Sequence, residues 1–258
     1  MARFDHLEFE TNQDEPVNRQ DGSHLDRDDQ YWLRMADQER RQGFFENALR
    51  YYSRALEKDK SLLKSWLGQV QMLIQLSEHP EAELWSRKAL ELFRNNSELL
   101  AGRAQAYCRL GDLKKAQELC DAALRQEGQS AYRWTVRGEL MARERGDIDR
   151  HCFDKALNLD DDWLVPAEIA CIYLHYRNPS KALIRARQAV ERAPDSPYCW
   201  YLQGFCEMEL ALTVKARESF KRCLQLSPNH AEARSRLAQL ANQKWSLGRT
   251  LRGLTRRS

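Results

Sequence analysis

The chain has little glycine and proline and lacks any long apolar run. It contains 11 Gly and 7 Pro among 258 residues, while 31% of its residues are charged. This composition suits long amphipathic helices and disfavours a β-sandwich, whose many turns use Gly and Pro. No apolar stretch reaches the roughly 18 residues that a membrane-spanning helix requires, and the first residues show no secretory signal. We therefore expect a soluble, mainly helical protein of the cytoplasm.

The seven cysteines lack the spacings that are typical of zinc sites and redox motifs. There is no C-x-x-C pair and no zinc-like pairing of cysteine with histidine. Because their number is odd and they are scattered, we expect reduced thiols that pack as small apolar side chains in a cytosolic protein.

Motifs of catalysis are also absent from the sequence. There is no phosphate-binding loop, no dinucleotide-binding glycine loop and no nucleophile elbow. His151 and Cys152 are the nearest His/Cys pair, but adjacent positions of a helix point about 100° apart. That pair therefore favours neither metal chelation nor thiol activation. We expect a protein that is not an enzyme and binds no cofactor and no metal.

Alanine recurs along the chain at a nearly fixed spacing. Ala48, Ala82 and Ala116 are evenly spaced, and the same step separates Ala182 from Ala216. A second, almost evenly spaced series lies a few residues after the first in the sequence. Its members are Ala55, Ala89, Ala123, Ala156, Ala189 and Cys223. A regular period of about 34 residues indicates an array of repeats, each of them one supersecondary unit.

Within each period the sequence predicts a pair of helices. Gly43 and Gly111 stand where a tight turn would join the two helices, and Pro194 and Pro228 stand where the second helix must end. A small residue recurs near position eight of the first helix, where it would let neighbouring helices approach closely. The small residues of this position are Ala36, Ala104, Gly138, Ala170 and Gly204.

This pattern resembles the tetratricopeptide repeat, for example in YWLRMADQERRQGFFENALRYYSRALEKDK at residues 31–60. The resemblance covers residues 29–230 and implies an all-α fold, a right-handed α-solenoid of about six helix-turn-helix repeats. The fourth repeat departs from the pattern, since one residue is missing between Gly138 and Ala156 and Asp149 replaces the expected alanine. We expect a shortened hairpin there.

Three segments follow from this interpretation. Residues 1–28 show no periodicity and lie in a stretch, 1–30, that holds nine acids against three arginines, which predicts an acidic disordered segment. Residues 29–243 form the solenoid, in which 231–243 is a C-terminal capping helix that covers the last repeat. Residues 244–258 form a basic tail with five cations and no acid. The net charge of +3 for the whole chain does not indicate a general nucleic-acid binder.

The resemblance also implies a concave groove, lined by the first helices, that binds a segment of a partner protein. In the first four repeats the predicted groove residues are polar with excess positive charge: Arg40, Arg41, Gln71, Gln75, Gln105, Arg109 and Arg143. In the last two repeats they are apolar and aromatic: Leu174, Tyr198, Tyr201, Phe205 and Met208. Two alternatives stay open. In the first, the aromatic residues pack in the core beneath the capping helix, as aromatic stripes usually do. In the second, the arginines are simply solvated, as is usual for charged residues on a helix surface.

The favoured hypothesis is a non-enzymatic adaptor whose groove binds a partner segment with acidic and apolar residues. An alternative is a tether to a membrane or nucleic acid through the basic tail, where leucines and arginines alternate at helical spacing. The residues of that pattern are Leu247, Arg249, Leu251, Arg252, Leu254 and Arg256. A third possibility is a regulatory subunit of a separately encoded enzyme. The sequence predicts no oligomeric state.

Overall fold

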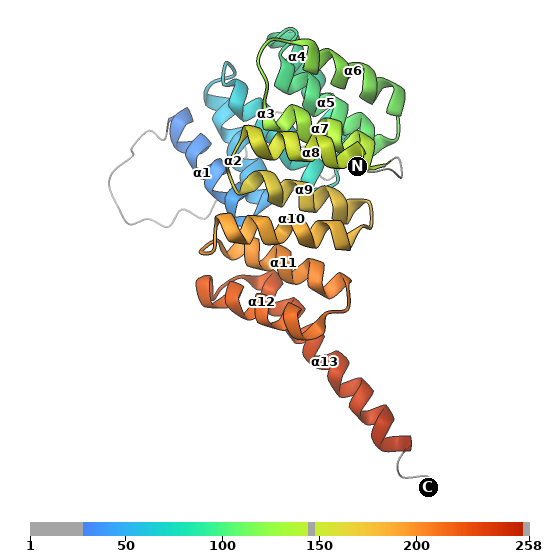
Figure 1. Cartoon of the computed structure of the whole chain (residues 1–258). Coiled ribbons are helices and arrows are strands. Elements are labelled where there is room, and N and C mark those ends of the chain that lie inside the picture. Colours follow the sequence, from blue (N-terminus) through green and yellow to red (C-terminus); the bar gives the residue numbers. More distant parts are fainter. Residues whose placement is uncertain (1–27, 144–147, 255–258) are drawn as a thin grey trace, which may run out of the picture. The chain divides into compact units, whose positions relative to one another are not determined.

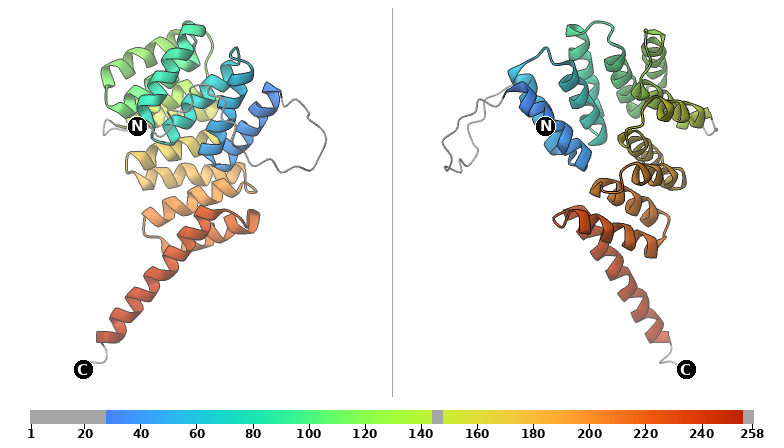
Figure 2. Two further views of the ribbon diagram at one scale, coloured as in Figure 1. Left: turned by 180° about the vertical axis from the view of Figure 1, so that it is seen from behind. Right: turned by 60° about the vertical axis from the view of Figure 1, so that its left-hand side comes forward.

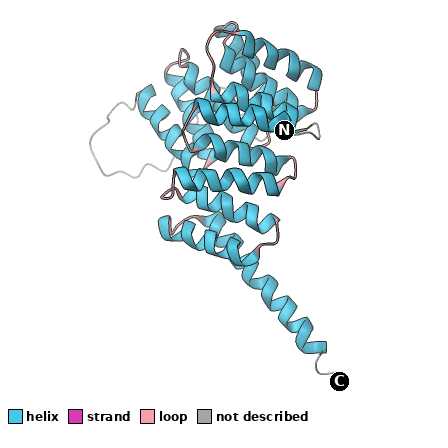
Figure 3. Ribbon diagram, in the orientation of Figure 1, coloured by secondary structure: helices cyan, strands magenta, loops and turns pink. Residues whose placement is uncertain are grey.

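The structure is a computed structural model that describes residues 28–143 and 148–254, with side chains through residue 242. Within these ranges every regular element is an α-helix and no strand occurs, which confirms the all-α fold (Figure 3). The chain divides into two compact units, Met1–Gln126 and Glu127–Ser258, which we call the N-terminal and C-terminal units.

The N-terminal unit is made of three helical hairpins. These are α1 (Asp29–Gln42) with α2 (Phe45–Lys58), α3 (Leu63–Gln75) with α4 (His79–Leu92), and α5 (Ser97–Leu110) with α6 (Leu113–Arg125). The helices follow the predicted period, because the first members of the three pairs begin at the evenly spaced residues Asp29, Leu63 and Ser97.

The C-terminal unit continues the same alternation and ends on a long single helix. It contains α7 (Ala131–Ala142), α8 (Ile148–Leu159), α9 (Leu164–His175), α10 (Pro179–Arg192), α11 (Pro197–Glu209), α12 (Thr213–Leu226) and α13 (Ala231–Leu254). Figures 1 and 2 show α9–α12 as successive layers of two helices, with α13 running on beyond the last hairpin.

The two alanine series lie at the helix contacts, as the period predicts. Every alanine of both series is at most 1% exposed, and Cys223 is fully buried in the sixth position of the second series. A methyl group at these points lets the backbones of two helices approach closely, whereas a larger side chain would hold them apart. The recurring small residues therefore set the spacing of the helices.

In the five hairpins whose turns are described, the first helix is followed by a residue in the left-handed conformation, either a glycine or a residue with a side chain. Gly43 and Gly111 have left-handed backbone conformations, with φ of 80° and 91°, as expected for glycines that end a helix. At the equivalent positions of three other hairpins stand Ser77, Arg177 and Ala211, with φ of 65°, 54° and 57°. A side chain makes that conformation less favourable, by about 1–2 kcal/mol. The geometry of the turn is therefore retained where the glycine is not.

Aromatic rings from second helices fill the space that glycines leave in first helices. Phe153 and Phe220 are fully buried, and they lie against Gly138 and Gly204, so that an added Cβ would come within 2.5 Å and 2.8 Å of the rings. Each ring belongs to the same hairpin as its glycine. The small residues near position eight thus accommodate the aromatic residues of the facing helix.

The fourth repeat has short helices, as its sequence suggests, whereas the end of the last helix differs from the one expected. In the fourth repeat α7 and α8 have only 12 residues each, in line with the missing residue, while the connecting residues 144–147 lie outside the described part. The last helix does not end at residue 243 but continues to Leu254, through Gly248. Each of the two glycines in this helix, Gly248 and Gly253, lowers helix stability by about 1 kcal/mol, and the helix nevertheless continues past Gly248. Residues 1–27 and 255–258, including Arg256, lie outside the described residues.

Candidate functional site

The first helices of the hairpins form one layer in each unit. In the N-terminal unit α3 packs on α5, and in the C-terminal unit α9 packs on both α7 and α11. Within a unit, the second helices pack instead on the first helices that precede and follow them in the chain. The first helices therefore have one side covered by second helices and another that is not. We call this second side the first-helix face.

On the N-terminal unit the predicted polar residues divide by exposure. Gln71 and Gln105, on α3 and α5, are only 7% and 5% exposed, and so they offer little surface to a ligand. Arg41 is exposed, while Arg40 and Arg109 are half-buried. Gln75 is also half-buried, at the end of α3. The part of this surface that a partner can reach is therefore mainly basic.

Tyr198 does not belong to the surface that the sequence predicts for it. It is 6% exposed, its ring contacts that of Trp163 at 6.4 Å between centroids, and its phenol lies 3.4 Å from the Cys171 sulfur. Burial raises the pKa of the phenol well above its usual value. Tyr198 is therefore a core residue between α9 and α11. The prediction was wrong here because an apolar helix stripe can face either the core or a ligand.

Tyr201 and Met208 lie in the packing between the last hairpin and α13. The Tyr201 ring stacks on His230 at 4.9 Å and contacts Phe220 of α12 at 6.0 Å. Met208 packs against the same buried cluster, together with Leu237 of α13. These contacts match the alternative that the sequence left open, in which part of the aromatic stripe packs beneath the capping helix.

Three predicted residues of the C-terminal unit keep part of their surface accessible. Leu174 and Phe205 are half-buried, on α9 and α11, and Arg143 is exposed at the end of α7. The guanidinium of Arg236 lies 5.2 Å from the centre of the Phe205 ring, where a cation is attracted to the face of the aromatic ring. An apolar surface with one adjacent cation results.

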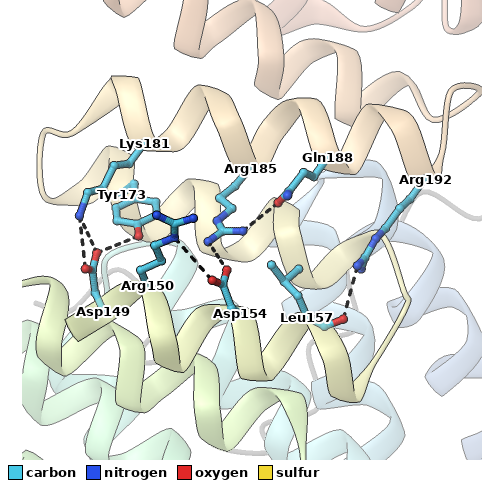
Figure 4. A network of polar contacts seen from close by, with 9 residues as sticks. All are labelled: Asp149, Arg150, Asp154, Leu157, Tyr173, Lys181, Arg185, Gln188 and Arg192. Carbon is cyan, nitrogen blue, oxygen red and sulfur yellow. Dashed lines mark hydrogen bonds and ion pairs between the residues drawn. The ribbon is translucent and has the colours of Figure 1, made fainter. Parts of the chain in front are cut away.

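An acid–tyrosine–lysine group that the sequence analysis missed joins successive hairpins (Figure 4). In the C-terminal unit Tyr173 of α9 donates to Asp149 of α8 at 2.8 Å, and Lys181 of α10 contacts the same carboxylate at 3.0 Å. Asp149 is 1% exposed. A buried carboxylate is stable only when it is well hydrogen-bonded and paired, and both conditions hold here.

A related group occurs in the N-terminal unit, where the acid pairs with an arginine and the lysine pairs with Asp112 at 2.8 Å. Tyr107 of α5 donates to Glu83 of α4 at 3.0 Å, and Lys115 of α6 lies 5.1 Å from the centre of the Tyr107 ring. Arg103 adds an ion pair of 2.6 Å to Glu83. Burial tends to raise the pKa of Glu83, but the hydrogen bonds from Arg103 and Tyr107 outweigh it and hold the pKa below its usual value.

A sequence signal for these groups exists. The acid, the tyrosine and the lysine each recur after the same interval, which is two repeat periods: Glu83 and Asp149, Tyr107 and Tyr173, Lys115 and Lys181. Asp149 by itself is only a departure from the alanine series. The recurrence of all three residue types indicates that it is the acid of such a group.

Figure 4 shows further polar contacts between α8 and α10, the second helices of two successive hairpins. Arg185 contacts Asp154 at 2.8 Å and also donates to Gln188, and Arg192 donates to the Leu157 carbonyl at 3.4 Å. Arginine near the end of a helix can satisfy carbonyls that have no partner within the helix. These contacts hold the repeats together and do not form a ligand site.

The thiols have properties of core residues. Six of the seven cysteines are buried, and Cys171 is half-buried. Burial raises the pKa of Cys199 to about 11 and that of Cys223 to about 12. Such thiols are protonated at neutral pH and are poor nucleophiles. Among the described residues, no group of three or more His, Cys, Asp or Glu side chains is placed to hold a metal ion. No helix in the described ranges combines the length and apolarity needed to cross a bilayer.

Comparison with known proteins agrees with this architecture. Sequence profiles of the tetratricopeptide repeat match residues 33–97 and 86–140. The tetratricopeptide repeat-containing protein trd-1 of Caenorhabditis elegans is 26% identical over 145 residues, which cover 55% of this chain and 18% of the relative. The matched region thus spans less than a fifth of that relative.

The solved structure of another repeat protein is similar in fold. A tetratricopeptide repeat protein from Parabacteroides merdae is 18% identical, with a TM-score of 0.50 over 88% of this chain and 87% of that one. A tetratricopeptide repeat protein from Thermus thermophilus is 14% identical, with a TM-score of 0.49 over 83% and 98% of the two chains. The chain therefore contains repeats of the tetratricopeptide family, which the profiles match over residues 33–140, and the helical hairpins and the buried alanine series continue the same pattern through the rest of the described solenoid.

Proposed function

We propose that this protein is a non-enzymatic scaffold that binds a segment of another protein on its first-helix face. Proteins of the tetratricopeptide repeat family are in general scaffolds for protein interactions, and they are generally not catalysts. The observation that carries the proposal is the layering of the first helices, which leaves one side of them uncovered by second helices. The buried thiols support a reducing compartment such as the cytoplasm.

The chemistry of the face indicates the kind of partner. On the N-terminal unit Arg40, Arg41 and Arg109 favour carboxylates, because a guanidinium can form two parallel hydrogen bonds with one carboxylate. On the C-terminal unit Leu174 and Phe205 favour apolar side chains. The proposed partner therefore offers acidic residues to the N-terminal unit and apolar residues to the C-terminal unit.

Substitutions on the face test this proposal in the full-length chain. Arg41→Glu with Arg109→Glu reverses two charges on first helices, and Phe205→Ala removes the aromatic side chain. Arg187→Glu with Lys221→Glu is the matched control, since both residues are exposed on second helices. The proposal predicts that the first two variants lose a partner captured by the parent, at unchanged melting temperature, while the control retains it. Loss in the control alone would contradict the proposal.

A second candidate function is a tether that acts through the C-terminal tail. It is supported by the extension of α13 to Leu254, which makes residues 244–254 helical rather than irregular. This stretch contains Lys244, Arg249 and Arg252 and no acid, a composition that suits an anionic membrane surface. Its side chains lie outside the described residues. Deletion of residues 244–258 tests it: the tether predicts loss of binding to vesicles that contain phosphatidylserine, and the scaffold predicts unchanged partner capture.

A further inference from the structure

His230 occupies the point where α13 begins. Its Nδ1 atom accepts a hydrogen bond from the Ala233 N–H at 3.3 Å, and its carbonyl accepts one from the Arg234 N–H at 3.2 Å. The first N–H groups of a helix have no partner within the helix, so that a side chain which accepts from one of them stabilises the first turn. An imidazole does this only when the nitrogen that accepts carries no proton.

The imidazole also connects α13 to the last hairpin. His230 is 4% exposed, and its ring stacks on that of Tyr201 at 4.9 Å with an angle of 30° between the rings. Tyr201 in turn contacts the buried Phe220. Ala233, in the first turn of α13, is fully buried in the same cluster. The first turn of α13 is thus held at the hairpin through the side chain that caps it.

The charged groups near His230 affect whether its imidazole is neutral or protonated. The Glu232 carboxylate of α13 lies 3.3 Å from Nδ1 and would accept from a proton-bearing nitrogen. Opposing this is the positive end of the helix dipole. Arg234 and Arg236 of the same helix contact the Pro228 carbonyl and the Phe205 ring. The titratable groups on the packed elements are Tyr201 of α11 and Cys223 of α12, both neutral at physiological pH. Burial lowers the pKa of His230, and Glu232 opposes that shift.

We propose that His230 is a pH-sensitive latch for α13. The neutral imidazole caps the helix and holds its first turn on the last hairpin. The proton-bearing imidazole donates from Nδ1 to Glu232, can no longer accept from Ala233, and releases that turn. Because the pKa in the folded protein is below that of the unfolded chain, the contribution to stability is complete above the unfolded value of about 6.5 and is lost as the pH falls below it.

The latch is tested on the full-length chain by NMR between about pH 7.5 and pH 5. The chemical shifts of the His230 ring give its titration, and hydrogen exchange, corrected for the intrinsic effect of pH, gives the protection of Ala233 and Arg234. The latch predicts that protection falls about fivefold, the ratio that corresponds to loss of an N-cap. The midpoint of this fall should coincide with the midpoint of the His230 titration. Protection that stays constant while His230 titrates would overturn it.

His230→Asn is the matched variant, because asparagine is also a good N-cap but does not titrate. The latch predicts that this variant keeps the protection of α13 at both ends of the pH range. His151→Asn, at an exposed histidine of α8, serves as the control and should retain the pH dependence of the parent. The latch is wrong if His230→Asn shows the same pH-dependent loss as the parent. If that variant does not fold, the test rests on whether the protection of Ala233 and Arg234 in the parent follows the His230 titration.

Discussion

The ring of Phe153 lies directly against the backbone of Gly138, so close that an added Cβ would stand 2.5 Å from its Cδ1 atom. The ring is fully buried and cannot move aside into solvent. Alanine normally stabilises a helix interior relative to glycine by about 1 kcal/mol. Here the overlap outweighs that gain, since no carbon atoms pack at such a distance.

We therefore expect Gly138→Ala to lower the free energy of unfolding by about 1–3 kcal/mol, the usual range for overpacking. Urea denaturation of the purified chain measures this change. In the double variant with Phe153→Leu the smaller side chain should make room for the methyl group, so that the two effects are not additive. A gain in stability on Gly138→Ala alone would show that the ring is not fixed by its neighbours.

Substitutions in the alanine series should also overpack helix contacts. Ala82 and Ala116 are at most 1% exposed, so Ala82→Leu or Ala116→Leu should lower the free energy of unfolding by about 1–3 kcal/mol. Ala238→Leu, at an exposed position of α13, is the control and should change it by no more than about 0.5 kcal/mol. Equal stability of all three variants and the parent would mean that the period has been assigned wrongly.

The two acid–tyrosine–lysine groups should respond alike to loss of the phenol. Tyr107→Phe and Tyr173→Phe each remove one hydrogen bond to a carboxylate, which should cost about 1–2 kcal/mol of stability. Because Asp149 is more deeply buried than Glu83, Tyr173→Phe should have the larger effect. Thermal unfolding of both variants measures the difference. If neither substitution changed the stability, these hydrogen bonds would be a result of the helix packing and would not contribute to it.

Glu83 makes stability depend on pH in the acid range. Its pKa in the folded protein lies below the usual value of 4.5, so its contribution is complete above that value and is lost as the pH falls through the lowered pKa. Denaturation from about pH 7 to about pH 3 should show a smaller loss of stability for Glu83→Gln than for the parent. Parallel curves for the two proteins would show that the ion pair with Arg103 has no net effect.

The sequence was sufficient for the parts of the fold that repeat. Regularly spaced alanines predicted the helix contacts, because a larger side chain would hold the helices apart. Gly43 predicted its turn, because glycine adopts the left-handed conformation without steric cost. The turns at Ser77 and Arg177 carry no such residue, since packing of the hairpin imposes the left-handed conformation there. Their positions follow from the period and not from local composition.

The candidate site was less predictable, for a physical reason. An apolar stripe on a helix shows that one side avoids water, but the stripe of Tyr198 and Tyr201 does not show whether the core or a ligand covers it. The answer depends on tertiary contacts, which α9 makes with Tyr198 and the start of α13 makes with Tyr201. In the same way, Gln71 and Gln105 are polar residues that helix packing buries. The exposure of Arg41 follows from its charge, since a charged side chain is rarely buried without a partner.

The account as a whole depends on where a partner binds, and hydrogen exchange of the full-length chain with and without a captured partner tests it most directly. Binding to the first-helix face predicts added protection in α3, α5, α9 and α11, reduced by Arg41→Glu with Arg109→Glu. Protection confined to second helices such as α10 and α12, or to residues 244–258, would contradict the account.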